Sequence, residues 1–334
     1  MLLIVSPSDS DAITKNDNEQ PTIVFDYSHG QDYRFSEINQ TEVKLRENLT
    51  EMGYNIIWAR GGLNSTILDS AVGLLVGSIF GDVGFSEYEI NVIADWFNGG
   101  RKFLWVGSDN DFLGTAINDN MSLILESVSS HVYPENLQVD DLVYTCEPGF
   151  GYRMYTPLVG NDSYIENIVD GVENVLMHGP TILYGSDAIN PAPGLNPVSL
   201  ETDTIQNVFP LLYYSSVSYI LTALDPNLYA HEVGEIGPFV ACTLEMDAGE
   251  SGKGVLIVSG ASPYGDYAPM YQESYYSADG LDGHIFVKQA IQFGIEKALE
   301  YPGPFSFPME LVIMAGIALL GIASCVLAKR FLGE

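Results

Sequence analysis

The chain has 334 residues, of which 46% are hydrophobic and 17% are charged. This length and apolar content allow a substantial buried core and exclude a disordered or fibrous protein. The 44 acidic residues outnumber the 13 basic ones and leave a formal net charge of −31. Such a surface repels phosphate backbones, so nucleic acid is not an expected partner.

The first 20 residues are expected to form a disordered lead-in or the remnant of a signal peptide. The opening "MLLIV" is shorter than the apolar region of a secretory signal, and no basic segment precedes it. Residues 6–20 are polar and contain few apolar side chains, a composition that does not support a packed core.

The segment from residue 21 to residue 107 alternates between apolar strands and amphipathic helices. Strands are predicted at 22–25, 54–59, 71–78 and 102–107. A helix between the first two strands presents one apolar face formed by Ile38, Leu45, Leu49 and Met52. A second helix begins at a capping box of Ser86 and Glu89 and ends before Gly99. This order predicts right-handed crossovers and a parallel sheet.

The middle of the chain, 130–250, has short strand-like pieces between Pro, Gly and Asn turns, and we interpret it as a β-rich insertion. The earlier pattern then returns with a strand at 253–262 and a helix at 282–300, whose inward residues are Val287, Ile291, Ile295 and Leu299. The predicted fold class is therefore α/β, with a doubly wound, mainly parallel sheet in one domain over 21–300.

An uncharged segment near the C-terminus, 311–328, reads "LVIMAGIALLGIASCVLA". It is just long enough for a membrane-spanning helix, and it follows a Pro-rich stalk at 301–310. Lys329 and Arg330 come directly after it, so the positive-inside rule predicts a single-pass protein of the cell membrane. In this orientation the large domain lies outside and the tail, 329–334, lies in the cytoplasm.

Polar side chains gather where the predicted parallel strands end, which is where ligands bind in open α/β sheets. The candidate ligand-binding residues are Asp26, Ser28, His29, Asp82, Ser108 and Asp109. Three interpretations stay open. The residues could simply terminate strands, they could bind a divalent cation or other ligand through their oxygens, or His29 could act as a base toward Ser108 in an exported hydrolase.

No catalytic residue, metal site or cofactor is predicted from these motifs. Ser108 lacks the Gly-x-Ser-x-Gly context of a nucleophile elbow, and the histidines and cysteines do not show zinc-ligand spacing. Cys146 and Cys242 are compatible with one disulfide or with two buried thiols. Five glycosylation acceptor sequences agree with an exterior location, and they begin at Asn39, Asn48, Asn64, Asn120 and Asn161.

The chain has 20 tyrosines, some of them in local clusters such as "DYAPMYQESYY". Tyrosine rings on an exposed surface suit carbohydrate or protein ligands, whereas tyrosines at the edge of a β-layer are only packing residues. A carbohydrate-binding surface would place Tyr264, Tyr267, Tyr275 and Tyr276 on one face.

The stretches "TIVFDYSHGQ", "LTEMGYNIIWA" and "FSEYEINVIADWFNGGRKFLWVGSDND" resemble the non-catalytic branch of the glutamine-amidotransferase-like superfamily. That branch includes GldG-type transporter-associated proteins and the 48-kDa subunit of oligosaccharyltransferase. The segment "GVLIVSGASPYGDY" and the helix after it are similar to the end of the same module. This chain departs from the oligosaccharyltransferase subunit because it has no further β-domain before its apolar segment.

The resemblance implies a membrane-anchored, non-catalytic accessory or scaffold subunit. Its expected partners are the membrane and other membrane-protein subunits, including a catalytic glycosyltransferase if the complex performs protein N-glycosylation. A transporter or cell-envelope assembly is the second candidate complex, and an exported hydrolase or a carbohydrate-binding envelope protein are the alternatives.

Small residues in the apolar segment, Gly316, Gly321 and Cys325, are expected to pack against another membrane helix. Replacing Gly321 with Leu should weaken attachment to the partner complex, because the larger side chain would hold two helix backbones apart. Co-purification in mild detergent measures the effect, with circular dichroism as the control for folding. Unchanged recovery of partners would show that the segment is only an anchor.

Overall fold

The computed structural model describes residues 20–31, 36–79, 83–110, 116–223, 228–265 and 267–302, without the side chains of 36–39. The helices are α1 (Ser36–Glu51), α2 (Ser65–Leu68), α3 (Glu87–Asn98), α4 (Ala116–Ser127), α5 (Glu166–Val169) and α6 (Gly283–Glu300). The strands of the large sheet are β1 (Thr22–Asp26), β2 (Asn55–Ala59), β3 (Ala71–Val76), β4 (Lys102–Gly107), β8 (Leu158–Val159), β12 (Val208–Tyr213), β14 (Val240–Ala248) and β15 (Gly254–Ser259).

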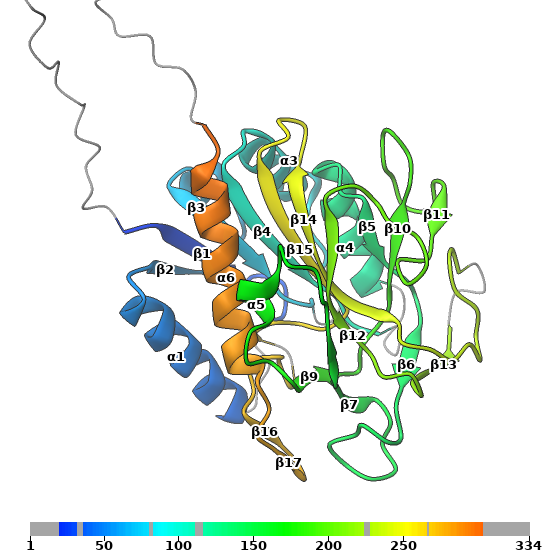
Figure 1. The fold of residues 1–334 in the computed structure, drawn as a ribbon. Helices are drawn as coiled ribbons and strands as arrows, with labels where there is room; N and C mark the ends of the chain where they lie inside the picture. Colours follow the sequence, from blue (N-terminus) through cyan, green and yellow to red (C-terminus); the bar gives the residue numbers. More distant parts are fainter. Residues whose placement is uncertain are drawn as a thin grey trace, which may run out of the picture. The chain divides into compact units, whose positions relative to one another are not determined.

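The remaining strands form small sheets beside the large one (Figure 1). They are β5 (Val132–Pro134), β6 (Gln138–Asp140), β7 (Arg153–Thr156), β9 (Val175–His178), β10 (Leu183–Ser186), β11 (Pro197–Val198), β13 (Tyr219–Thr222), β16 (Ser274–Tyr275) and β17 (Ala278–Asp279). All of them except β16 and β17 lie between β4 and β15 in the sequence.

The eight-stranded sheet has the order β2-β1-β3-β4-β15-β14-β12-β8. Neighbouring strands are parallel from β2 to β15 and antiparallel from β15 to β8. The predicted α/β class is confirmed, and the sheet is mixed because the middle of the chain adds three antiparallel strands to the parallel core.

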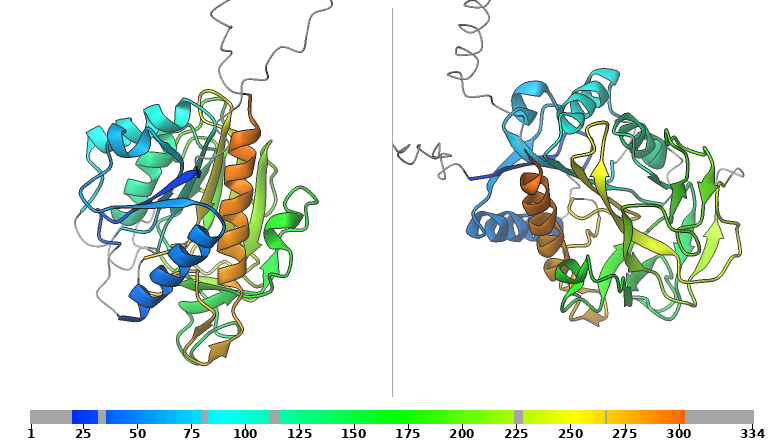
Figure 2. Two further views of the ribbon diagram at one scale, coloured as in Figure 1. Left: turned by 90° about the vertical axis from the view of Figure 1, so that its left-hand side faces the viewer. Right: turned by 45° about the horizontal axis from the view of Figure 1, so that its top comes forward.

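Helices cover both faces of the parallel strands, with α1 and α6 on one side and α2, α3 and α4 on the other (Figure 2). Alternate residues of each strand therefore meet different helices. In β4, the Trp105 ring packs edge to face on Phe286 of α6, with ring centroids 6.0 Å apart. Its neighbour Leu104 belongs to the buried cluster on the other face, together with Ile93 and Phe97 of α3.

The start of α3 follows from local chemistry and matches the prediction. The Ser86 hydroxyl accepts a hydrogen bond from the Glu89 N–H, and the Glu89 carboxylate accepts one from the Ser86 N–H. These two bonds satisfy N–H groups that the first turn of a helix leaves free.

Two residues predicted to face inward are substantially exposed instead. Leu299 is 37% exposed, and the last turn of α6 buries Ala298 in its place. Met52 is also 37% exposed, because α1 ends at Glu51 and Met52 lies beyond the apolar face. The other inward residues of these two helices whose side chains are described are all buried: Leu45, Leu49, Val287, Ile291 and Ile295.

Within the described residues, the structure contains no helix that is long and apolar enough to cross a membrane. The predicted span at 311–328 lies outside those residues, as do Gly316, Gly321 and Cys325. The anchor, its orientation and its packing surface therefore stay predictions.

The contact between α6 and β4 is tight at Gly294, where an added Cβ would overlap the ring of Phe103. Alanine gains about 1 kcal/mol over glycine in helix propensity, but overpacking a core costs about 1–3 kcal/mol. Because the obstacle is a fully buried ring, we expect Gly294→Ala to lower the free energy of unfolding by about 1–2 kcal/mol in urea titrations. Gln292→Ala on the exposed face of α6 is the control and should change it by less than about 0.5 kcal/mol. A Gly294→Ala protein as stable as the wild type would contradict this packing.

Candidate functional site

The end of β1 carries a closed set of hydrogen bonds around the buried carboxylate of Asp26. Its Oδ2 lies 2.7 Å from His29 Nδ1 and accepts a bond of 2.9 Å from the Gln31 amide, while its Oδ1 accepts the Ser28 N–H at 3.0 Å. The Gln31 Oε1 in turn accepts the His29 N–H at 2.9 Å. The turn after β1 is therefore folded around the carboxylate that ends the strand.

His29 is held on its other sides by α3 and by Phe85, two residues before that helix begins. Its Nε2 lies 3.4 Å from Glu89 Oε1, and its ring packs on Phe85 with centroids 3.9 Å apart. Burial alone would lower the pKa of His29, but the hydrogen bond and charge of Asp26, helped by Glu89, raise it above its usual value. A histidine placed between two carboxylates is suited to carry a charge and join two elements, whereas a catalytic base must release its proton easily.

Ser28 also serves the backbone around it. Its hydroxyl donates to the Ala59 carbonyl at 3.0 Å and accepts the Gly62 N–H at 2.8 Å, which joins the end of β1 to the end of β2. Asp26, Ser28 and His29 thus lie together in the turn after β1, while Asp82 lies outside the described residues. Ligand binding by these residues stays a prediction.

Ser108 and Asp109 lie at the end of β4, which is two strands away from β1 in the sheet. At about 4.8 Å per strand, the two strand backbones are roughly 10 Å apart. Ser108 is fully buried, and its hydroxyl has no hydrogen-bond partner among the described residues. Since both ring nitrogens of His29 face carboxylates, the structure does not bring His29 and Ser108 into the contact that a hydrolase would require.

The Asp109 carboxylate contacts the backbone of the next residue. Its Oδ1 accepts the Asn110 N–H at 2.7 Å, and the Asn110 N–H also donates to the Gly179 carbonyl at 2.8 Å. Among the described residues, no group of three His, Cys, Asp or Glu side chains has the arrangement of a metal site.

A buried tyrosine ties this sheet edge together. The Tyr264 hydroxyl accepts the Gly77 N–H at 3.0 Å and lies 2.7 Å from the Asp26 carbonyl and 2.9 Å from the Leu75 carbonyl. Tyr264 is only 1% exposed, so it cannot belong to a carbohydrate-binding surface. That part of the tyrosine prediction is wrong, because the ring fills the space between the ends of β1 and β3.

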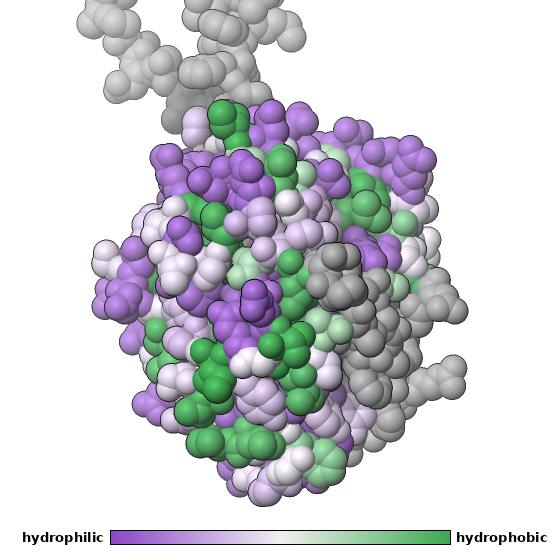
Figure 3. Space-filling model, turned by 90° about the vertical axis from the view of Figure 1, so that its right-hand side faces the viewer, coloured by the Kyte–Doolittle hydropathy of each residue, from purple (hydrophilic) through white to green (hydrophobic). Residues whose placement is uncertain are grey.

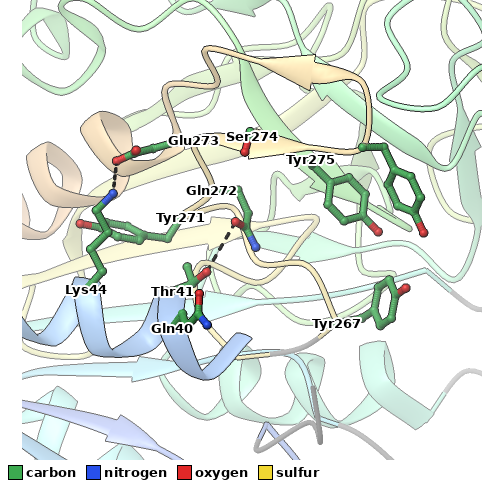
Figure 4. A pocket seen from close by; sticks show the side chains of 10 residues that line it. Gln40, Thr41, Lys44, Tyr267, Tyr271, Gln272, Glu273, Ser274 and Tyr275 are labelled. Atoms are coloured by element: carbon green, nitrogen blue, oxygen red, sulfur yellow. Dashed lines mark hydrogen bonds and ion pairs between the residues drawn. The ribbon is translucent and has the colours of Figure 1, made fainter. Parts of the chain in front are cut away.

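Tyr267, Tyr275 and Tyr276 line one open hollow together with Tyr271, opposite Gln40 and Thr41 of α1. We call this hollow the tyrosine groove; its volume is about 720 Å³. In Figure 4 the rings of Tyr267 and Tyr275 lie at one end, Lys44 and Glu273 lie at the other, and the Gln272 amide lies between them. The tyrosine cluster in the sequence indicated this site. Nothing in the sequence indicated that α1 forms the opposite wall.

His231 is a second buried histidine, and its sequence context did not indicate a site because its partners are distant from it in the chain. His231 lies between two carboxylates, with Nδ1 at 3.4 Å from Glu135 Oε2 and Nε2 at 3.1 Å from Glu201 Oε2. Glu135 also accepts the N–H groups of Tyr229 and Ala230 at 3.1 and 2.6 Å. These contacts fasten the segment that leads into β14.

The acceptor asparagines differ in their surroundings. The Asn48 amide donates to the Tyr271 hydroxyl, the Asn64 side chain caps α2, and the Asn120 side chain accepts the Phe85 N–H. Asn161 is exposed, and the side chain of Asn39 is not described. Glycosylation at these positions stays a prediction, and Asn161 offers the most accessible amide of the four that are described.

The two described cysteines, Cys146 and Cys242, are both buried and free. Burial raises the pKa of the Cys146 thiol to about 12, and that of Cys242 is also raised well above its usual value. Between the two possibilities that the sequence left open, the structure has two inert buried thiols and no disulfide between them.

The His231 cluster predicts a pH-dependent stability. Burial opposes the charge of His231, but its interactions with Glu135 and Glu201 raise its pKa from 6.5 to about 9. Its contribution of roughly 3 kcal/mol should be complete below pH 6.5 and be lost as the pH rises to about 9. His231→Gln should therefore be less stable than the wild type by about that amount at pH 6 and by less than about 1 kcal/mol at pH 9.5. Urea titrations at both pH values measure this, and an equal gap at both would contradict a charged His231.

No protein-family model and no curated protein matches this chain. Among solved structures, it is similar to the mmIFT52 N-terminal domain, with a TM-score of 0.53 and 13% identity over 82% of this chain and 97% of that one. At this identity the similarity shows a shared fold and nothing about function.

Two further solved structures are less similar. A ThuA-like protein from Bacteroides uniformis is 10% identical with a TM-score of 0.41, covering 84% of this chain and 94% of that one. A GMP synthase subunit-like protein from Thermoplasma acidophilum is 11% identical with a TM-score of 0.34, covering 82% and 96%. Both scores are below 0.5 and are too low to show a common fold. The score of 0.53 shows that this chain shares the fold of the mmIFT52 N-terminal domain.

Proposed function

We propose that this chain is a non-catalytic accessory or scaffold subunit of an extracytoplasmic membrane complex, built on an amidotransferase-like domain. An oligosaccharyltransferase complex that performs protein N-glycosylation is the first candidate, and a transporter-associated envelope complex is the second. The sequence resemblance and the apolar segment at 311–328 support this assignment.

One observation carries the proposal. The polar residues at the end of β1 bond to one another: Asp26, His29 and Gln31 form a closed set that Glu89 completes. An active site instead aims its polar groups at the space that the substrate will occupy. The cluster is therefore suited to holding the domain rigid for contact with another protein.

The surface around the ribbon of β6 and β13 supports a role in assembly. Apolar side chains gather in the lower part of the face shown in Figure 3. Exposed apolar residues border this ribbon: Leu142 (56%), Val143 (67%), Val217 (47%) and Ile236 (68%). Exposed apolar groups that cluster on a folded domain commonly mark a surface for another protein.

The test compares partner recovery from membranes in mild detergent for three variants of the full chain. Val143→Asp combined with Ile236→Asp should reduce recovery of the partner subunits about tenfold, because it buries charge in an apolar contact. Ile189→Asp is the matched control, since Ile189 is also apolar and is 98% exposed in the turn between β10 and β11. His29→Gln combined with Ser108→Ala should leave recovery and complex activity unchanged and lower only the stability.

Mass spectrometry of the recovered proteins identifies the complex. Recovery of envelope components without any glycosyltransferase would reject the first candidate. Loss of the activity of the intact complex in the folded His29→Gln, Ser108→Ala protein would reject a non-catalytic role.

A further inference from the structure

The tyrosine groove lies apart from the strand-end cluster and has the dimensions of a ligand site. Its volume of about 720 Å³ is within the range of about 300–1,000 Å³ that is typical of small-molecule sites. One wall comes from α1 and the other from the segment between β15 and α6, so the walls are far apart in sequence.

The rings of the groove are held in place before any ligand arrives. Tyr276 is 54% exposed, and the Arg153 guanidinium lies 4.5 Å from the centre of its ring. Arg153 is itself fixed by an ion pair with Glu147. Tyr275 contacts the Tyr276 ring edge to face at 4.7 Å and packs against His178 at 5.8 Å. A supported, exposed ring loses little freedom when a ligand stacks on it.

The backbone at Tyr276 indicates that the ring has a purpose beyond folding. Tyr276 and Ser277 form the turn between β16 and β17, and Tyr276 has a φ of +49°. Asn and Gly are the usual residues for this conformation in a two-residue hairpin, and a bulky side chain there is strained. Strained backbone residues are concentrated at ligand sites, and here the strained residue exposes an aromatic ring.

The polar groups of the groove favour an uncharged ligand with many hydroxyls. Lys44 and Glu273 form an ion pair of 2.5 Å, so their charges offset each other, and the whole chain is strongly acidic. Thr41 donates to the Gln272 Oε1 at a long 3.5 Å, a contact that a better partner could replace. Sugar hydroxyls both donate and accept, and sugar rings present C–H faces to aromatic side chains.

A proline-rich peptide is the competing ligand class, because aromatic-lined grooves also bind such peptides. Its prolines have no N–H group and so offer no hydrogen-bond donor to the oxygens of Glu273 and Gln272, whereas each sugar hydroxyl can donate one. We therefore propose that the tyrosine groove binds a neutral oligosaccharide by stacking on Tyr276 and hydrogen bonding to the polar side chains between Lys44 and Tyr275. The inference does not depend on the identity of the partner complex.

The experiment titrates the full chain with neutral tetrasaccharides, cellotetraose and chitotetraose, by isothermal calorimetry in detergent. Tyr276→Asn removes the ring and relieves the backbone strain, so the protein should stay folded while affinity falls about tenfold or more. Tyr276→Phe keeps the ring and should retain binding within about threefold, because stacking does not need the hydroxyl. Tyr88→Asn is the matched control, because Tyr88 is 59% exposed on α3, and it should bind as the wild type does.

Three results would overturn the inference. The first is the absence of binding to either sugar at about 10 mM, a concentration above the weak millimolar range. The second is equal sugar binding by Tyr276→Asn and the wild type. The third is binding of a proline-rich peptide in place of the sugars. Recovery of partner subunits in the same variants distinguishes the two proposals, because Tyr276→Asn should not affect it.

Discussion

The parallel pairing of β4 with β15 is the constraint on which the rest of this structure depends. It runs from Lys102 opposite Gly254 to Gly107 opposite Ser259, and the Trp105 indole donates to the Ser259 hydroxyl at 2.9 Å. The pairing joins the N-terminal and C-terminal parts of the α/β domain at the middle of the sheet. Because the two strands are parallel, the intervening segment leaves at the carboxyl end of β4 and returns to the amino end of β15, beside Lys102. The chain that follows β15 is thereby brought to the end of β1, where Tyr264 closes the polar edge.

The segment that follows β15 also forms one wall of the tyrosine groove. After Tyr264 the chain continues to Tyr267 and then to the β16–β17 hairpin, which faces α1. Three polar contacts join the described parts of the two walls: Lys44 with Glu273, Asn48 with Tyr271, and Thr41 with Gln272.

The two histidine clusters show how an acidic protein stabilises buried carboxylates. His29 lies between Asp26 and Glu89, and His231 lies between Glu135 and Glu201. A buried carboxylate without a partner would cost several kcal/mol. In each cluster a histidine with a raised pKa supplies the missing positive charge and also joins elements that are distant in the chain. The polar strand end of β1 resembles an active site in sequence, and in the structure its residues join β1 to α3.

Local patterns in the sequence determined most of the α/β core. The apolar strand at 102–107 and the capping box of Ser86 and Glu89 appear in the structure as predicted, because both depend on neighbouring residues only. Asp26, Ser28 and His29 lie together for the same local reason, because they are neighbours in one turn. Only the tertiary structure decided that Tyr264 is buried while Tyr276 is exposed, and that His231 meets Glu135 and Glu201. Those outcomes depend on pairings such as β4 with β15, which link residues far apart in the chain and leave no local periodicity to read.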